Sequence, residues 1–285
     1  MLAVKVKAIA LMEFGRLVHS RVFQLSLVLV PLFTVGLGYL STRFEQAGPP
    51  PVGGSLGPAS ALVPVASMVL LFLMVMLTTP QMMSSVIEEK MSRISEVLLA
   101  SVSAFDLMAG KLLACCGAAA LVGAIYLPLG LLLAWSFGYG ALVSPLALLY
   151  LALFFVLAVL LHGSMYMAVG AACSEPKDAQ GMLAPLVLLT SIPLITVRTL
   201  LQDPASSLAR GLSFFPLSAP FVMCFRLNCS PPPRAAEVGL SVGITLAAAL
   251  GCVWVASRIF RVGLLAMGKP PSLGELWAWV FVDRS

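Results

Sequence analysis

Continuous apolar runs of about 20 residues recur along this chain, and they limit its fold more than any other feature. An α-helix of that length crosses the hydrocarbon core of a bilayer, which is about 30 Å thick. Only helices and closed barrels satisfy their backbone groups in lipid, and these runs do not have the alternation of barrel strands. Only 10% of the residues are charged and 60% are hydrophobic. The sequence therefore predicts an all-α membrane protein.

The runs predict six transmembrane helices within one membrane domain that covers residues 1–285. The predicted spans are 22–41, 61–80, 112–136, 145–172, 181–198 and 238–257. The excess of Lys and Arg over Asp and Glu is explained by basic loops on one side of the membrane, so we expect no nucleic-acid partner.

The distribution of basic residues predicts the orientation. With the N-terminus inside, 12 of the 17 Lys and Arg residues lie on the inner side. They are Lys5, Lys7, Arg16, Arg21, Lys90, Arg93, Lys111, Lys177, Arg258, Arg261, Lys269 and Arg284. The positive-inside rule then places both termini in the cytoplasm and the protein in the cytoplasmic (inner) membrane.

The segments at the two ends of the chain have amphipathic character. Residues 1–21 place Ile9, Met12 and Leu17 at helical spacing, opposite a polar side with Lys5, Lys7, Glu13, Arg16 and Arg21. This pattern is typical of a helix that lies among lipid headgroups. In the cytoplasmic tail, 258–285, Ser272 and Glu275 form a capping-box pattern, and Trp277 and Trp279 follow as headgroup-level anchors.

The segment 199–237 is apolar but is interrupted by Pro216 and Pro220. It is too short to cross and return, so we expect a re-entrant helical hairpin near the outer surface, covered by protein. A single crossing here is the alternative, and it would place the basic C-terminal tail outside. Cys224 and Cys229 lie in this segment and are interpreted as free thiols, with a disulfide as the alternative.

The segment 82–103 contains the densest charge of the chain, in the stretch EEKMSRISEVLL (88–99). Its apolar residues form one helical face: Ile87, Met91, Ile94 and Leu98. Its charged residues Glu89, Arg93 and Glu96 share another face. Ser103 and Asp106 match a capping box. We therefore expect a cytoplasmic amphipathic helix that ends near Ala100, followed by a new helix from Ala104.

Two further patterns fall inside predicted spans. Small residues recur at four-residue spacing in the last span, at Gly239, Gly243, Ala247 and Gly251, which suits close helix packing either within one subunit or between two. His162 and Ser164 form a polar pair, for which an intramembrane hydrolase is the alternative function, although the G-x-S-x-G context is missing. No metal site is expected.

Several motifs in this order resemble the permease subunits of ABC-2 type exporters, in the sodium- and drug-efflux branch. They are EEKMSRISEVLL, GKLL (110–113), GAACSEPKDAQGMLAPLVLL (170–189), LSFFPLSAPFVMCFRL (212–227) and SRIFRVGLLAMGKPPSLGELWAWV (257–280). Many members of that branch carry a large outer domain between the first two spans. This chain has only a Pro- and Gly-rich loop there, so the resemblance does not extend to the substrate.

The resemblance implies that a separate ATPase subunit drives the protein. It assigns the contact with that subunit to five charged residues, Glu88, Glu89, Lys90, Arg93 and Glu96. It also implies a dimer with a second permease chain, the same or related, that forms the path through the membrane. The sequence contains no G-x-x-x-x-G-K-[ST] phosphate loop, so we expect no cofactor in this chain, no enzyme activity of its own, and ATP with Mg bound by the partner. A passive channel is the remaining alternative.

Overall fold

The computed structural model describes residues 2–21, 23–25, 28, 32, 36, 39, 58–92, 102–136, 138–140, 143–264, 266, 271 and 273–281. These residues form α-helices and no strands. The long helices are α3 (Pro58–Met91), α5 (Ala104–Ser136), α6 (Pro145–Ala172), α7 (Pro176–Ile195) and α11 (Ala235–Gly263). The short ones are α1 (Leu2–Val18), α8 (Val197–Gln202), α9 (Ser207–Phe214), α10 (Ala219–Leu227) and α12 (Leu273–Phe281).

Five helical segments of the described residues are long and apolar enough to cross a membrane: α3, α5, α6, α7 together with α8, and α11. They confirm the helical class and provide a candidate span at five of the six predicted positions. The first predicted span, 22–41, lies mostly outside the described residues, so a sixth crossing stays a prediction.

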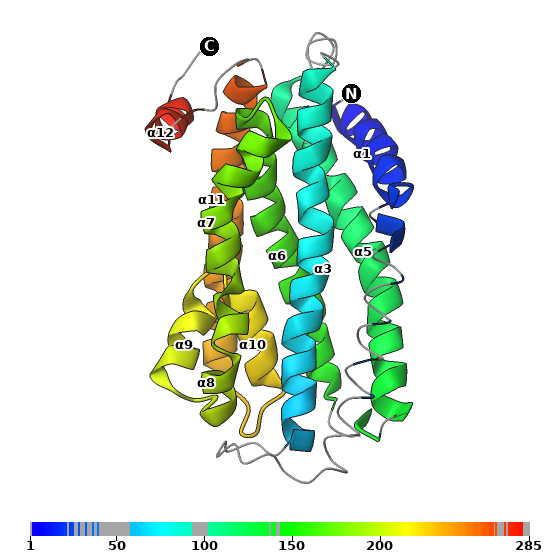
Figure 1. Ribbon diagram of the computed structural model, residues 1–285, viewed down its shortest axis with the longest axis vertical. Coiled ribbons are helices and arrows are strands. Elements are labelled where there is room, and N and C mark those ends of the chain that lie inside the picture. Colours follow the sequence, from blue (N-terminus) through cyan, green and yellow to red (C-terminus); the bar gives the residue numbers. More distant parts are fainter. Residues whose placement is uncertain are drawn as a thin grey trace.

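The long helices run side by side, and the short ones gather at their ends (Figure 1). One end, here called the α1 end, has α1, α12 and both ends of the described chain. The other end, the hairpin end, has α8, α9 and α10 (Figure 1). The charged stretch at the end of α3 and the broken 199–237 segment thus lie at opposite ends of the bundle.

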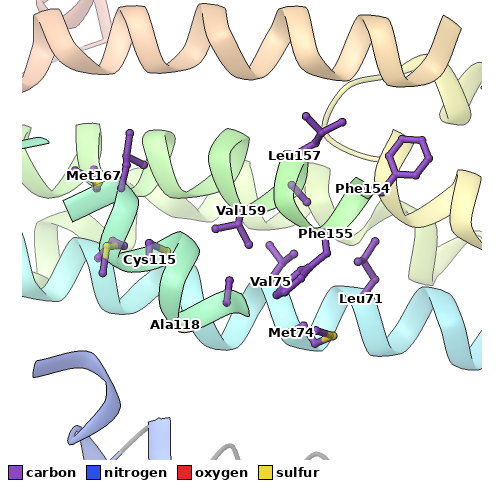
Figure 2. Close-up of a cluster of buried hydrophobic side chains, with 14 of the residues drawn as sticks. Leu71, Met74, Val75, Cys115, Ala118, Phe154, Phe155, Leu157, Val159 and Met167 are labelled. Carbon is purple, nitrogen blue, oxygen red and sulfur yellow. The ribbon is translucent and has the colours of Figure 1, made fainter. Parts of the chain in front are cut away.

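Helix α6 forms the centre of the core, because 56% of its most apolar stretch is buried. Figure 2 shows how Leu71, Met74 and Val75 of α3 lie opposite Phe155 and Val159 of α6. Helix α5 is continuous past Pro128. Since lipid tails are as apolar as these side chains, close packing rather than hydrophobic transfer holds such helices together.

Two helices extend beyond the predicted spans where charged residues begin. Helix α3 continues eleven residues past the predicted span end at residue 80, through Pro80, to Met91. Helix α5 begins at Ala104, as predicted, eight residues before the predicted span. The mean hydropathy falls at Glu89 and at Lys111, but both side chains are buried and form an ion pair with each other at 3.0 Å. The 145–172 span was predicted with the observed limits.

The 199–237 segment is helical but broken, as predicted, and protein covers much of it. Every residue of α10 from Ala219 to Arg226 is buried. The Arg226 guanidinium lies 2.7 Å from Glu237 of α11, and it donates to the Pro204 carbonyl at 3.0 Å and to Ser213 Oγ at 3.1 Å. One buried cation thus ties α10 to α9 and α11 and gives the interrupted backbone polar partners.

Candidate functional site at the charged end of α3

Helix α3 ends at Met91, so Glu88, Glu89 and Lys90 form its last turn rather than the start of a separate amphipathic helix. The first part of the predicted amphipathic helix is thus continuous with α3, and its predicted end near Ala100 lies outside the described residues. The three side chains differ sharply in exposure: Glu88 is exposed, Glu89 is 3% exposed and Lys90 is fully buried. Arg93 and Glu96, the other two residues that the resemblance assigned, lie outside the described residues.

Glu89 belongs to a buried group of charges from three helices. Lys111 Nζ of α5 lies 3.0 Å from Glu89 Oε1 and 3.2 Å from Glu13 Oε1 of α1. Arg16 of α1 approaches the same two oxygens, at 2.8 Å and 3.3 Å respectively. Ser85 accepts a hydrogen bond from Lys111 at 2.7 Å and donates one to Glu13 Oε2 at 3.3 Å. We call Glu13, Arg16, Glu89 and Lys111 the four-charge cluster.

The four-charge cluster balances two anions with two cations away from water. Glu13 is 1% exposed and Lys111 is fully buried, whereas half of the Arg16 side chain is exposed. Burial raises the pKa of Glu13, but interactions with Lys111, Glu89 and Arg16 together outweigh that effect, and the pKa lies below its ordinary value of 4.5. Removing one charge of such a group leaves another buried without compensation, which costs several kcal/mol. The cluster therefore fixes α1 against the ends of α3 and α5.

Close packing of α1 on α5 brings the charges together. A Cβ atom at Gly110 would lie 2.6 Å from Ile9 Cγ2, so only glycine fits at this crossing. A Cβ at Gly117 would lie 3.2 Å from the Phe14 ring. Lys111 follows directly after Gly110, and its stem therefore starts where the two helices are closest. The glycine allows the close helix contact from which Lys111 reaches Glu13 and Glu89.

Lys90 faces a different set of helices. Its ammonium group donates to the carbonyl oxygen of Ala171 near the end of α6 and to that of Gly263 at the end of α11, both at 2.8 Å. The last carbonyls of a helix have no partner within the helix and carry partial negative charge, so a cation there is stabilising. One lysine of α3 thus caps two other helices.

Two glycines allow α3, α6 and α11 to meet at this point. A Cβ at Gly263 would lie 2.7 Å from the Ala171 carbonyl oxygen, and one at Gly170 would lie 2.9 Å from the Met83 carbonyl oxygen. Both contacts are with backbone, which cannot move aside as a flexible side chain does. A larger residue at either glycine would push the helix ends apart, and Lys90 would then no longer reach both acceptors.

The last turn of α3 therefore points in three directions. Glu89 contacts α1 and α5, Lys90 contacts α6 and α11, and Glu88 faces outward. These ion pairs and hydrogen bonds connect the α3 end to four helices, so they suit a mechanical connection rather than a reaction. Among the described residues, no cluster of three or more His, Cys, Asp or Glu suits a metal ion.

Sequence reasoning missed the inward role of Glu13 and assigned it to the polar side of α1. The buried face of α1 contains Ile9, Glu13 and Leu17, whereas Met12 is 48% exposed. A signal was available, because positions 9, 13 and 17 have a strict four-residue spacing. A glutamate at a buried position of this spacing, together with a lysine in another apolar helix, indicates a buried ion pair such as that of Glu13 and Lys111.

The structure confirms Ser103 as the N-cap of α5 and its pairing with Asp106. Ser103 Oγ accepts from the Asp106 backbone N–H at 3.1 Å and donates to Asp106 Oδ2 at 2.7 Å. The cap fixes the point at which the chain re-enters the bundle after the segment that follows α3. The second predicted box is not tested, since Ser272 lies outside the described residues.

The small residues of α11 do not pack inside the described part of the subunit. Gly239, Gly243, Ala247 and Gly251 are all exposed, and a Cβ at any of the three glycines would meet nothing within 4 Å. Packing within one subunit was one of two open interpretations, and the described residues do not support it. Large apolar side chains flank the exposed stripe: Leu240, Leu246, Leu250 and Trp254.

His162 and Ser164 are both buried but do not act on each other. His162 Nδ1 lies 2.9 Å from the Ala158 carbonyl, and Ser164 Oγ donates to the Leu161 carbonyl at 2.8 Å. Residues two apart on a helix point to different sides. The pair thus has the geometry of two back-bonded polar residues, which does not favour the hydrolase alternative. Cys224 and Cys229 are free thiols, as interpreted from the sequence.

Comparison with known proteins gives a consistent result. Residues 56–258 match the family described as "ABC-2 family transporter protein". The uncharacterized protein MJ1024 of Methanocaldococcus jannaschii is 30% identical over 208 residues, which are 72% of this chain and 50% of that protein. The uncharacterized protein YhaP of Bacillus subtilis is 28% identical over 227 residues, 75% of this chain and 54% of that protein. The chain thus spans about half the length of the curated relatives it matches.

Proposed function

Because the chain belongs to the ABC-2 family of transporter membrane proteins, we propose that it is the permease subunit of an ATP-driven exporter. In this role it forms the path through the membrane together with a second permease chain, and a separate ATPase subunit supplies the energy. The chain itself carries no phosphate loop, so ATP and Mg²⁺ are bound by the partner. The efflux-type branch suggested by the C-terminal motifs is part of the same proposal.

The arrangement of the α3 end is the observation that carries this proposal. The charged segment starts there, and the last turn of α3 is tied to α1, α5, α6 and α11 through buried charges. A partner that binds Glu88 and the segment after Met91 therefore contacts the one point from which four helices can be moved. A solvated loop would need none of these buried pairs.

The sidedness of the proposal rests on the basic residues of the α1 end. Lys5, Lys7, Arg21, Lys177 and Arg261 are exposed there. Under the positive-inside rule this end faces the cytoplasm, where the ATPase and its ATP are found, and α1 lies among anionic headgroups. The hairpin end then faces the outside.

We assign the dimer contact to the exposed stripe of α11. Small residues at four-residue spacing, flanked by large apolar ones, let two helices approach closely in lipid. A Gly243→Cys variant is expected to form a disulfide-linked dimer in native membranes after mild oxidation. A Leu188→Cys variant on the exposed face of α7 is the matched control, since Leu188 is 66% exposed and lies off the stripe. Equal dimer yields from both variants would argue against the stripe.

Co-purification tests the proposal as a whole. The tagged chain is expressed with a candidate phosphate-loop ATPase from the same genome, extracted in mild detergent and passed over a sizing column. We expect the ATPase to co-elute with wild type and with Asp203→Lys, an exposed acid at the hairpin end. Glu88→Lys is expected to lose most of the bound ATPase.

Two results would contradict the proposal, and they differ in what they refute. If no ATPase co-elutes with wild type, the coupled-transporter assignment is wrong. If Glu88→Lys retains as much ATPase as Asp203→Lys, the assignment of the contact surface to the exposed side of the α3 end is wrong.

A further inference from the structure

The resemblance assigned Lys90 to contact with the ATPase, but its side chain is turned into the bundle. Lys90 is fully buried, and both of its hydrogen bonds go to main-chain carbonyls of other helices, at Ala171 and Gly263. A side chain without solvent exposure cannot meet a second protein unless the helix ends separate first. Its function must therefore be sought inside this chain.

We propose that Lys90 is a positioning residue that carries movement of the α3 end to the C-terminal ends of α6 and α11. This inference rests on the proposed function, because an ATPase is what would move the α3 end. The four-charge cluster performs the same task toward α1 and α5, through the neighbouring residue Glu89. Glu89 thus connects α3 to α1 and α5, and the adjacent Lys90 connects α3 to α6 and α11.

The two hydrogen bonds of Lys90 are strong enough to keep the helix ends together when α3 moves. A charge-assisted hydrogen bond is roughly twice as strong as a neutral one. Lys90 makes two such bonds, at 2.8 Å each, in a place that water does not reach. A buried ammonium that lost its acceptors would pay a large desolvation cost, so α6 and α11 follow Lys90 when α3 moves.

The central position of α6 makes this connection important. Helix α6 packs along both α3 and α11 and forms the core shown in Figure 2. If its C-terminal end follows α3, the whole core tilts, and the hairpin end at the far side of the bundle changes its packing (Figure 1). Without Lys90, α3 can move at its end while α6 and α11 stay behind.

The first test measures the connection in the chain itself, without any ATPase. Two variants disrupt the hydrogen bonds between Lys90 and the helix ends. Lys90→Met removes the donor ammonium, and Gly263→Ala forces the two acceptor carbonyls apart. Gly181→Ala is the matched control, because a Cβ there meets nothing within 4 Å. We expect the amides of Cys173 and Leu264, which close the last turns of α6 and α11, to exchange hydrogen about tenfold faster in both variants. Unchanged exchange in both variants overturns the inference.

The second test measures transmission in the complex with the co-purified ATPase. Spin labels are placed at Met91→Cys at the α3 end and Glu175→Cys just after α6, both exposed positions. In wild type we expect the label-to-label distance to stay constant when the complex is trapped with Mg-ADP-vanadate, because the two helix ends move together. In Lys90→Met the distance should change on trapping, and Lys90→Arg, which keeps the charge, should restore part of the wild-type behaviour.

The outcomes separate this inference from the proposed function. If no ATPase binds wild type, the proposed function fails, while the exchange measurement still decides whether Lys90 holds the helix ends. If the ATPase binds but trapping gives Lys90→Met the same distances as wild type, transmission through Lys90 is refuted. A variant with faster exchange and the wild-type response to trapping also refutes it.

Discussion

Lys111→Met is the most informative single substitution at the four-charge cluster. The change removes an ammonium that lies 3.0 Å and 3.2 Å from the carboxylates of Glu89 and Glu13, and leaves the half-exposed Arg16 as the one cation of the cluster. Removing one partner of a buried ion pair typically costs about 3–5 kcal/mol. At about 2 °C per kcal/mol for a chain of this size, the apparent melting temperature should fall by roughly 6–10 °C.

The buried native cysteines supply the assay. Cys115, Cys173, Cys224 and Cys229 are buried free thiols, so a thiol-reactive dye reports unfolding of the detergent-solubilised protein. The exposed Lys177 provides the control, Lys177→Met.

A second substitution distinguishes the charge effect from a packing effect. Lys111→Met combined with Glu13→Gln leaves one cation and one anion, Arg16 and Glu89. The double variant should therefore melt above the value expected from adding the two single effects, by an amount that measures their coupling. If Lys111→Met melts within the error of Lys177→Met, or if the two effects are additive, the cluster does not hold buried charges in balance.

The remaining predictions concern how α1 and α5 are held. Gly110→Val should displace α1, because its Cβ would overlap the Ile9 side chain; faster proteolysis of the N-terminal helix, with Gly130→Val as a control in open space, measures this. Ser103→Ala should destabilise the start of α5 by about 1 kcal/mol, seen as faster exchange of the Asp106 amide, and an unchanged rate would contradict the cap. Because the pKa of Glu13 is lowered, its contribution to α1 docking is complete above its ordinary value of 4.5 and is lost as the pH falls through the lower folded value. Exchange protection of α1 should thus be constant from neutral pH to pH 5, and Glu13→Gln should remove the loss seen in stronger acid.

Helix class and most crossings could be predicted from the sequence because long apolar runs have only one stable form in lipid. The capping box at Ser103 was also predictable, since its two residues interact within one turn. The helices extend past the predicted ends of the spans where paired charges enter them, as at Glu89 and Lys111. Hydropathy counts each charge as a cost and contains no information on the partner that offsets it.

The candidate site could be located from the sequence, but the directions of its side chains could not. The pattern of EEK identified the end of α3 as unusual. Which of its three residues faces outward depends on α1, α6 and α11, which lie far away in sequence. Lys90 meets Ala171 and Gly263 only after the bundle has formed, and no local periodicity encodes main-chain carbonyls as partners.

Site-directed cross-linking at three consecutive residues tests the central claim most directly. Glu88, Glu89 and Lys90 are each replaced by a photo-reactive amino acid in the chain bound to its ATPase, and cross-links are identified by mass spectrometry. We expect position 88 to cross-link to the ATPase, position 89 to α1 or α5, and position 90 to α6 or α11. Equal cross-linking of all three positions to the ATPase would show instead that the α3 end is a surface helix.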